Sequence, residues 1–258
     1  MLSYQHIYHA GNLADVHKHS LLAWMLNQLI QKDKPLSYLE THAGRALYRL
    51  DAAEALKTGE AAQGIARANA LNWFDTAHPY AKTIRATHSD HGINCYPGSP
   101  LIASQILRPV DSLHLAELHP QEFAALDYAV PKAKCYQQDG FEMAQSICPP
   151  TPRRGLLLID PSYEVKTDYD LIPTQIAALH RKWNVGIIML WYPILSDAPH
   201  RKMLNALTKA HPDALRHEVS FPPARQGHRM VGSGLFILNP PYRIEGETAR
   251  LSELFATL

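Results

Sequence analysis

The chain has 258 residues, with 25 basic and 24 acidic side chains, and 46% of its residues are hydrophobic. This composition excludes a largely disordered chain and provides enough apolar side chains for one sizeable core, alone or with an insertion. The longest apolar runs, 155–159 and 185–191, are far shorter than the roughly 18 residues of a membrane-spanning helix, and residues 1–12 lack the pattern of an export signal. Its three cysteines form no C-x-x-C pair. We therefore expect a soluble, cytoplasmic protein without disulfide bonds.

Helix and strand signals alternate along the chain, which is the pattern of a parallel sheet with helical crossovers. Residues 20–30 carry four leucines and a methionine at helical spacing and predict a helix that ends at Lys34-Pro35. The last two apolar runs, 215–221 and 231–238, are joined by a loop of proline, arginine and glycine and predict an antiparallel hairpin. Further apolar runs followed by turn residues predict strands at 36–41, 112–118, 133–136, 155–159 and 185–191.

Between residues 51 and 94 the composition changes to alanine-rich helical segments with no strand-like run. We interpret 51–94 as an inserted helical subdomain, and 1–50 with 95–258 as one Rossmann-like α/β domain. About seven strands, mostly parallel and ending in a hairpin, are the layout of Rossmann-like methyltransferases, although many other α/β enzymes share it.

Acidic residues close several of the predicted strands. Ligands of open α/β sheets bind beyond the carboxyl ends of the strands, where this chain has Glu40, Glu117, Asp139 and Asp160. A nucleoside offers the hydroxyl and amino donors that such carboxylates accept. The segment 40–46 after the first strand predicts a turn into a helix, but the chain has neither G-x-G-x-x-G nor a P-loop. An adenosine cofactor without phosphates is the better match.

The most specific local pattern is a buried strand that runs into Asp160-Pro161-Ser162-Tyr163. Asp160 and the carbonyl of Pro161 can each accept one hydrogen bond from an adenine amine, while Tyr163 stacks on the base, an interaction worth about 1–3 kcal/mol. Asp-Pro can equally just end a strand. A second strand end, Asn239-Pro240-Pro241-Tyr242, is a competing candidate. It is disfavoured because only 16 residues follow it, unless the motif order is permuted.

Several segments together carry a family resemblance. The segment YHAGNLADVHKH at 8–19 is the most specific, and the match continues through 40–45, 96–100, 139–142 and the Asp160 turn. In these segments the chain resembles the bacterial RlmJ family, which transfers a methyl group from S-adenosylmethionine to N6 of an adenine in 23S ribosomal RNA. Ser162 departs from the second proline usual in that family's turn, and Ala46 from its second glycine.

The resemblance implies an enzyme that binds S-adenosylmethionine and 23S ribosomal RNA as a monomer without a metal. Asp160, Pro161 and Tyr163 would be catalytic, with Asp160 as the proton acceptor, and Tyr4, Lys18 and Tyr163 would contact the RNA. The implied cofactor-binding residues are His19, His42, Ser99, Glu117, Asp139, Gly140 and Asp160.

Two other functions stay open at this point. His6, His9, His17 and His19 suggest a metal-dependent hydrolase, although His17 and His19 point to different sides of a helix or strand and there is no H-E-x-x-H pattern. A non-catalytic RNA-binding protein with a degenerate pocket is the other alternative. Among several basic clusters, the hairpin loop 225–229 is the one we expect to contact RNA.

Overall fold

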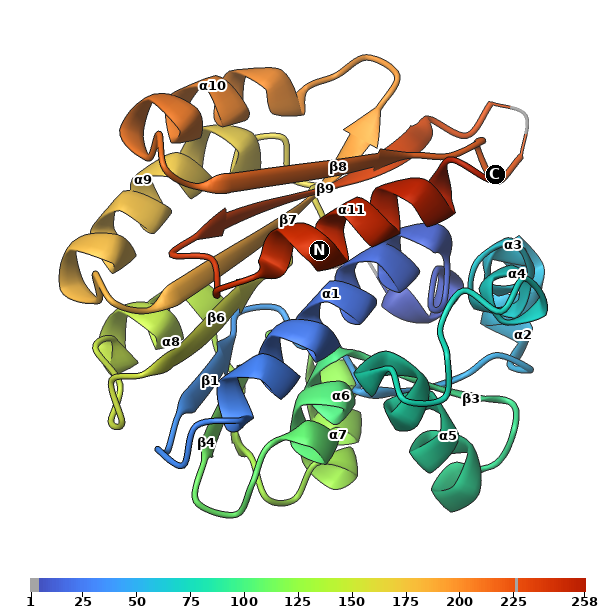
Figure 1. Ribbon diagram of the computed structural model, residues 1–258, viewed down its shortest axis with the longest axis horizontal. Helices are drawn as coiled ribbons and strands as arrows, with labels where there is room; N and C mark the ends of the chain where they lie inside the picture. The colour runs from blue at the N-terminus through green and yellow to red at the C-terminus, as the bar shows by residue number, and fades with distance from the viewer. Residues whose placement is uncertain (1–4, 226) are drawn as a thin grey trace.

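In the computed structural model, which describes residues 5–225 and 227–258, a seven-stranded sheet forms the centre of the molecule (Figure 1). The strand order is β5-β4-β1-β6-β7-β9-β8. All neighbouring pairs are parallel except β7 with β9 and β8 with β9. The predicted mostly parallel sheet with a final antiparallel hairpin is therefore confirmed. The strands are β1 (Ser37–Glu40), β4 (Ser112–Ala116), β5 (Lys134–Tyr136), β6 (Gly155–Ile159), β7 (Ile187–Leu195), β8 (Leu215–Ser220) and β9 (Met230–Leu238).

Successive residues of a strand point to opposite faces of the sheet, and here the residues on both faces are apolar. Helices therefore cover both faces. In β6, Leu156 and Leu158 pack in one cluster and Leu157 and Ile159 in the other. The first cluster includes side chains of α1 (Leu13–Ile30), α6 (Ser99–Ile106), α7 (Pro120–Ala129) and α11 (Ile244–Phe255). The second includes side chains of α8 (Gly140–Ile147), α9 (Asp168–Lys182) and α10 (His200–Ala210). In the described part of the chain, no helix combines the length and apolar character needed to cross a membrane.

Helix α1 is longer than the sequence pattern predicts. It begins at Leu13 and not near Ser20, because the side chain of Asn12 caps it by accepting a hydrogen bond from the backbone of Asp15 at 2.8 Å. The first two turns of the helix mix apolar residues with the polar residues Asp15, His17, Lys18 and His19, and all of them are buried in the structure. Apolar periodicity therefore could not reveal them.

The segment after β1 leads into a short strand, so the predicted turn into a helix is wrong. Gly44 and Ala46 have φ angles of 63° and 66°, in the left-handed region that a right-handed helix does not use. The chain continues into β2 (Leu47–Arg49), which pairs antiparallel with β3 (Cys95–Pro97).

Four α-helices lie between β2 and β3, within residues 51–94. They are α2 (Ala53–Thr58), α3 (Glu60–Gln63), α4 (Ile65–Ala70) and α5 (Pro79–His91). A third apolar cluster packs Tyr80 and Ile84 of α5 and Ile65 of α4 together with Val16 and Ala23 of α1. This segment thus packs against α1 and lies at the right of the molecule in Figure 1, next to the N-terminal half of that helix. Its status as a separate subdomain stays a prediction.

Candidate active site

A cavity of about 760 Å³ lies at the carboxyl ends of the parallel strands. The strand ends bring His42, Glu117 and Asp160 to it from β1, β4 and β6, and α8 contributes its first residue and N-cap. All described residues predicted for catalysis, cofactor and RNA binding line this cavity, and Tyr4 lies outside the described residues. The predicted residues in the wall are Lys18, His19, His42, Ser99, Glu117, Asp139, Gly140, Asp160, Pro161 and Tyr163.

Glu117 fixes the loop after β1 at one end of the cavity. Its Oε2 accepts a hydrogen bond from the backbone N–H of Gly44 at 2.8 Å, and its Oε1 accepts one from that of His119 at 2.7 Å. Burial raises the pKa of Glu117, while the two backbone donors oppose that change. Since each carboxylate oxygen has two lone-pair sites, Glu117 can hold these loops and still accept from a ligand hydroxyl.

The start of α8 forms the adjacent wall. Asp139 caps this helix, and its Oδ1 accepts from the backbones of Phe141 and Glu142 at 2.8 and 3.0 Å. Gly140 packs directly against β1: a Cβ atom there would lie 1.8 Å from the carbonyl oxygen of Thr41. Any other residue at this position would push α8 away from the sheet and change the cavity wall.

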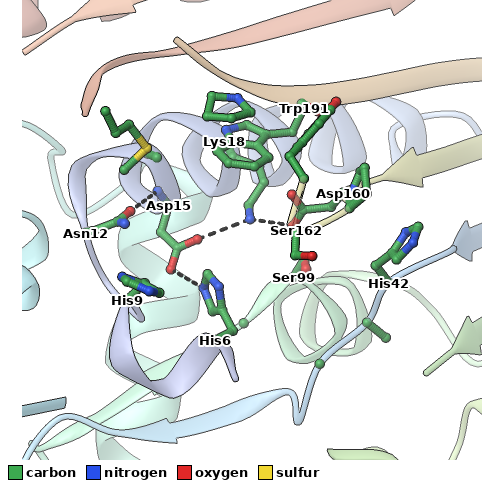
Figure 2. Close-up of a pocket in the computed structure, with 18 of the residues that line it drawn as sticks. His6, His9, Asn12, Asp15, Lys18, His42, Ser99, Asp160, Ser162 and Trp191 are labelled. Carbon is green, nitrogen blue, oxygen red and sulfur yellow. Dashed lines mark hydrogen bonds and ion pairs between the residues drawn. The ribbon is translucent and has the colours of Figure 1, made fainter. Parts of the chain in front are cut away.

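Asp160 is paired with a buried lysine. Nζ of Lys18 lies 2.5 Å from Oδ2 of Asp160 and 3.1 Å from Oδ1 of Asp15 (Figure 2). Burial alone would lower the pKa of Lys18, but the two carboxylates outweigh it and the pKa is raised. The ammonium therefore stays charged and holds Oδ2 of Asp160, which leaves Oδ1 as the oxygen that can accept from a ligand. The side chain of Asp160 remains 12% exposed.

Lys18 also lies over the ring of Trp191, with Nζ 5.3 Å from the ring centroid. The predicted contact of Lys18 with RNA is therefore restricted to a group that enters the cavity, because only 3% of this residue is exposed.

The sequence patterns did not predict Trp191 and Asp15 as wall residues. Trp191 is the last residue of the predicted strand 185–191, which was the signal for it; in the structure β7 continues to Leu195, and Trp191 lies just beyond the level at which β6 ends, since Ile159 pairs with Leu190.

Tyr163 lies in the wall with little exposed surface. Its φ angle is 56°, its hydroxyl donates to the carbonyl of Trp191 at 2.7 Å, and its ring centroid is 4.6 Å from that of Tyr169. Only 8% of the residue is exposed. Stacking of Tyr163 on a base stays a prediction, limited to the ring surface that faces the cavity.

The competing motif lies at the other end of the sheet. Strand β9 is antiparallel to β7, and its last residue, Leu238, pairs with Ile188 near the start of β7. Asn239 donates from its side chain to the carbonyls of Asn184 and Gly186 at 2.9 and 2.7 Å. The motif is thus remote from the carboxyl ends of the parallel strands, and Asn239 ties two loops together.

Of the four N-terminal histidines, His6 and His19 approach the same carboxylate, Asp15, but the four do not meet at one point. His6 bonds Asp15 at 2.8 Å, and His9 bonds Glu60 at 3.0 Å. His17 contacts His217 and Ser233, both at 2.9 Å, while His19 contacts Tyr96 at 2.8 Å. In residues 5–225 and 227–258, no three histidine, cysteine, aspartate or glutamate side chains are grouped to hold a metal ion. The hydrolase hypothesis has no support in this arrangement.

Glu40 lies behind the cavity wall and is fully buried. It accepts hydrogen bonds from the hydroxyls of Ser99 at 2.5 Å and Tyr38 at 2.8 Å. Burial raises the pKa of Glu40 to about 8, although both hydroxyls oppose that change. Glu40 is therefore mainly a neutral acid at neutral pH, and in that form its own O–H donates in one of these two hydrogen bonds. The network ends at Ser99 in the wall.

We expect this acid to make folding pH-dependent. A glutamate in the unfolded chain ionises near pH 4.5, whereas Glu40 in the fold keeps its proton up to about pH 8. Its contribution to the free energy of unfolding is fully present below pH 4.5 and is lost as the pH rises through 8. Relative to Glu40→Gln, the wild type should lose more than about 1.4 kcal/mol over this window, the equivalent of one pKa unit. Urea unfolding across the window measures the difference, and parallel curves for the two proteins would contradict the prediction.

Comparisons with known proteins identify the family. The family model described as "Ribosomal RNA large subunit methyltransferase D, RlmJ" matches residues 33–257. "Ribosomal RNA large subunit methyltransferase J" of Escherichia coli strain K12 is 39% identical over 254 residues, which cover 95% of this chain and 89% of the relative. The protein of the same name from Haemophilus influenzae is 37% identical over 257 residues, with the same coverage of each chain.

A solved structure agrees with these relatives. The crystal structure of a protein from Legionella pneumophila str. Philadelphia 1 is 34% identical in sequence and superposes with a TM-score of 0.86, covering 96% of this chain and 93% of the other. The family model spans most of the chain, and two relatives above 30% identity cover nearly all of it. The chain belongs to the RlmJ family of ribosomal RNA large subunit methyltransferases.

Proposed function

We propose that this protein transfers the methyl group of S-adenosylmethionine to N6 of an adenine in 23S ribosomal RNA. The observation that carries the proposal is the position of Asp160. This carboxylate closes a central parallel strand, is oriented by Lys18, and opens onto the same cavity as Glu117 and Asp139. Such an arrangement combines a nucleoside site with an acceptor for an amine.

The wall residues fit an adenosine cofactor. Glu117 and Asp139 supply carboxylate oxygens for hydroxyl and amino donors. The sequence has neither of the glycine patterns of phosphate-binding loops, G-x-G-x-x-G and G-x-x-x-x-G-K-S/T. A volume of about 760 Å³ is within the range of sites for small molecules and cofactors. S-adenosylmethionine would supply an electrophilic sulfonium methyl group, held by His19, His42, Ser99, Glu117, Asp139 and Gly140.

Asp160 and Pro161 would act on the adenine amine. The nitrogen of an aromatic amine is a poor nucleophile because its lone pair is delocalised into the ring. Hydrogen bonds from its two protons to Oδ1 of Asp160 and the carbonyl of Pro161 favour a tetrahedral nitrogen with a localised lone pair. The methyl group would leave its sulfur as the new N–C bond forms, and the nitrogen would lose one proton, which Asp160 accepts and passes to solvent. No covalent enzyme intermediate is required, so positioning supplies much of the rate.

The base must leave its stack to reach Asp160, which costs a few kcal/mol. Three side chains of the loop between β8 and β9, Arg225, His228 and Arg229, line the cavity. Arg229 is also paired with Asp197 at the surface. We propose that this loop contacts RNA phosphates near the extruded nucleotide, where positive side chains offset the charge of the backbone.

The test is methyl transfer to unmodified RNA. The purified protein is incubated with an in vitro transcript of 23S ribosomal RNA and cofactor carrying a labelled methyl group, and the digested nucleosides are separated. Label in N6-methyladenosine supports the proposal. Label in another nucleoside overturns the assigned position, and binding of RNA without any turnover favours the non-catalytic RNA-binding alternative.

Cofactor binding should stabilise the fold measurably. At 100 times its dissociation constant, S-adenosylmethionine is expected to raise the free energy of unfolding by about 2.7 kcal/mol, because it binds the folded state alone. Thermal and urea unfolding with and without cofactor provide the measurement. ATP is the matched control, since it shares the adenosine but adds phosphates for which the site has no cradle. An equal shift with ATP would contradict the specificity proposed for this site.

A further inference from the structure

A chain of buried hydroxyl groups connects the helices inserted between β2 and β3 to the cavity wall. Tyr80 belongs to α5 and Tyr96 to β3, and both are almost completely buried. Their hydroxyl oxygens are 2.9 Å apart, and the hydroxyl of Tyr96 lies 2.8 Å from Nδ1 of His19. The rings of His19 and Tyr96 stack with their centroids 5.7 Å apart. Of the three residues, His19 alone lines the cavity.

The surroundings of His19 determine which of its nitrogens carries the hydrogen. Burial lowers the pKa of His19 to about 3, so the ring is neutral and has a single N–H group. Its Nε2 faces Oδ1 of Asp15 at 3.7 Å. Burial would raise the pKa of Asp15, but His6 and Lys18 outweigh it and hold that pKa well below its usual value. An ionised carboxylate favours a hydrogen on Nε2 over a lone pair, which makes Nδ1 the acceptor.

This assignment fixes the direction of the whole chain. With Nδ1 as an acceptor, Tyr96 donates its O–H to His19, and Tyr80 donates its O–H to Tyr96. In the reverse direction Tyr80 would need a further acceptor, but within the described residues its hydroxyl bonds only to Tyr96. A buried O–H without an acceptor is costly. Tyr80 is therefore the terminal donor of the chain.

We propose that the inserted helices are a positioning element of the cofactor site: Tyr80 and Tyr96 hold His19 with its N–H at Nε2 and its ring fixed against the cavity. This inference rests on the proposed function. The two tyrosines touch no ligand and act through His19, which makes them positioning residues. Segment 51–94 would thus contribute to cofactor binding through Tyr80, in addition to packing against α1.

Tyr80→Phe tests the proposal most directly, because it removes the terminal donor and keeps the ring. We expect the dissociation constant for S-adenosylmethionine, measured by calorimetry, to rise about three- to tenfold, the effect of one buried hydrogen bond. The KM for the cofactor should rise by the same factor, while kcat at saturating cofactor should change less than about twofold, since Asp160 is untouched. Tyr96→Phe should give a larger loss, because it removes the partner of His19 itself.

Thr87→Val is the matched control on the same helix. Thr87 is fully buried in α5 and donates to the carbonyl of Thr83 at 2.9 Å, outside the tyrosine chain. The change removes one hydroxyl of α5 at constant shape. An affinity near that of the wild type is expected. An equal loss of affinity in Thr87→Val would overturn the proposal, since it would show that any weakening of α5 affects the cofactor.

Two substitutions of His19 test the tautomer and do not depend on the folding of the tyrosine variants. The amide nitrogen of glutamine can take the place of Nε2–H, whereas that of asparagine takes the place of Nδ1. We expect His19→Gln to bind the cofactor more tightly than His19→Asn, and Tyr80→Phe to have little further effect in the His19→Gln background, where Nδ1 is absent. The opposite order, or an undiminished effect of Tyr80→Phe in that background, would overturn the proposal.

The outcome for the wild type separates this inference from the function on which it rests. If the wild type does not bind S-adenosylmethionine, the proposed function fails and this inference falls with it. If the wild type binds and Tyr80→Phe binds equally well, this inference alone is overturned.

Discussion

Asp160→Asn is expected to reduce methyl transfer by at least about 100-fold, the scale of losing one polar group that acts in the transition state. Asparagine has nearly the shape of aspartate but cannot accept the proton that leaves the amine. It also loses the charge that pairs with Lys18 at 2.5 Å. Initial rates with cofactor and RNA at saturation measure the effect on kcat, and calorimetry with the cofactor shows whether the pocket is intact.

Asn239→Ala is the matched control for this experiment. Asn239 is the first residue of the competing Asn-Pro-Pro-Tyr motif, but its side chain bonds the backbone of Asn184 and Gly186. We expect this variant to lose some stability and to keep kcat near that of the wild type. Turnover that survives Asp160→Asn and disappears in Asn239→Ala would move the catalytic site to the other end of the sheet.

Lys18→Met is expected to lower the free energy of unfolding by about 3–5 kcal/mol, as is typical when one partner of a buried ion pair is removed. Lys18 is 3% exposed and lies between Asp15 and Asp160. Methionine keeps much of the volume, but it leaves the two carboxylates facing each other without a cation. Urea unfolding measures the loss of stability. Methyl transfer should fall as well, because Asp160 loses the group that orients it.

Lys202→Met supplies the comparison at the surface. Lys202 pairs with Asp170 at 2.8 Å, but the two side chains are 84% and 60% exposed. Exposed pairs of this kind contribute up to about 1 kcal/mol. We expect the free energy of unfolding of this variant to lie within about 1 kcal/mol of the wild-type value. Similar losses in both lysine variants would show that burial of the Lys18 pair has no special energetic importance.

Local sequence patterns were sufficient to predict the central strands and the residues that close them. β6 is a run of apolar residues followed by an aspartate and a proline, and that pattern alone places Asp160 at a carboxyl strand end. Because parallel strands end at one edge, the same reasoning brings Glu117 and His42 near it. The family resemblance added His19 and Ser99, whose positions no strand pattern indicates.

The remaining features depend on contacts between distant parts of the chain. Lys18 and Asp160 are 142 positions apart, and no periodicity indicates that they pair. The first two turns of α1 contain polar side chains between apolar ones, yet His17 and His19 are buried because they bond residues of other elements. The turn after β1 has a glycine where the pattern predicts the start of a helix, but Gly44 and Ala46 have left-handed angles, and a Cβ at Gly44 would lie 2.4 Å from the hydroxyl oxygen of Tyr48 in β2. Such features require the tertiary structure.

The short ladder between β2 and β3 brings the two ends of the intervening segment together. Arg49 pairs with Cys95, so the chain leaves and returns to the core at facing positions. Since the entropic cost of closing a loop grows only with the logarithm of its length, we expect a change in the length of this segment to cost little loop entropy, provided that α5 keeps Tyr80 beside Tyr96. A tight turn that joins β2 directly to β3 would give a shortened protein. That protein would need polar residues on α1 at the positions that now pack against the inserted helices.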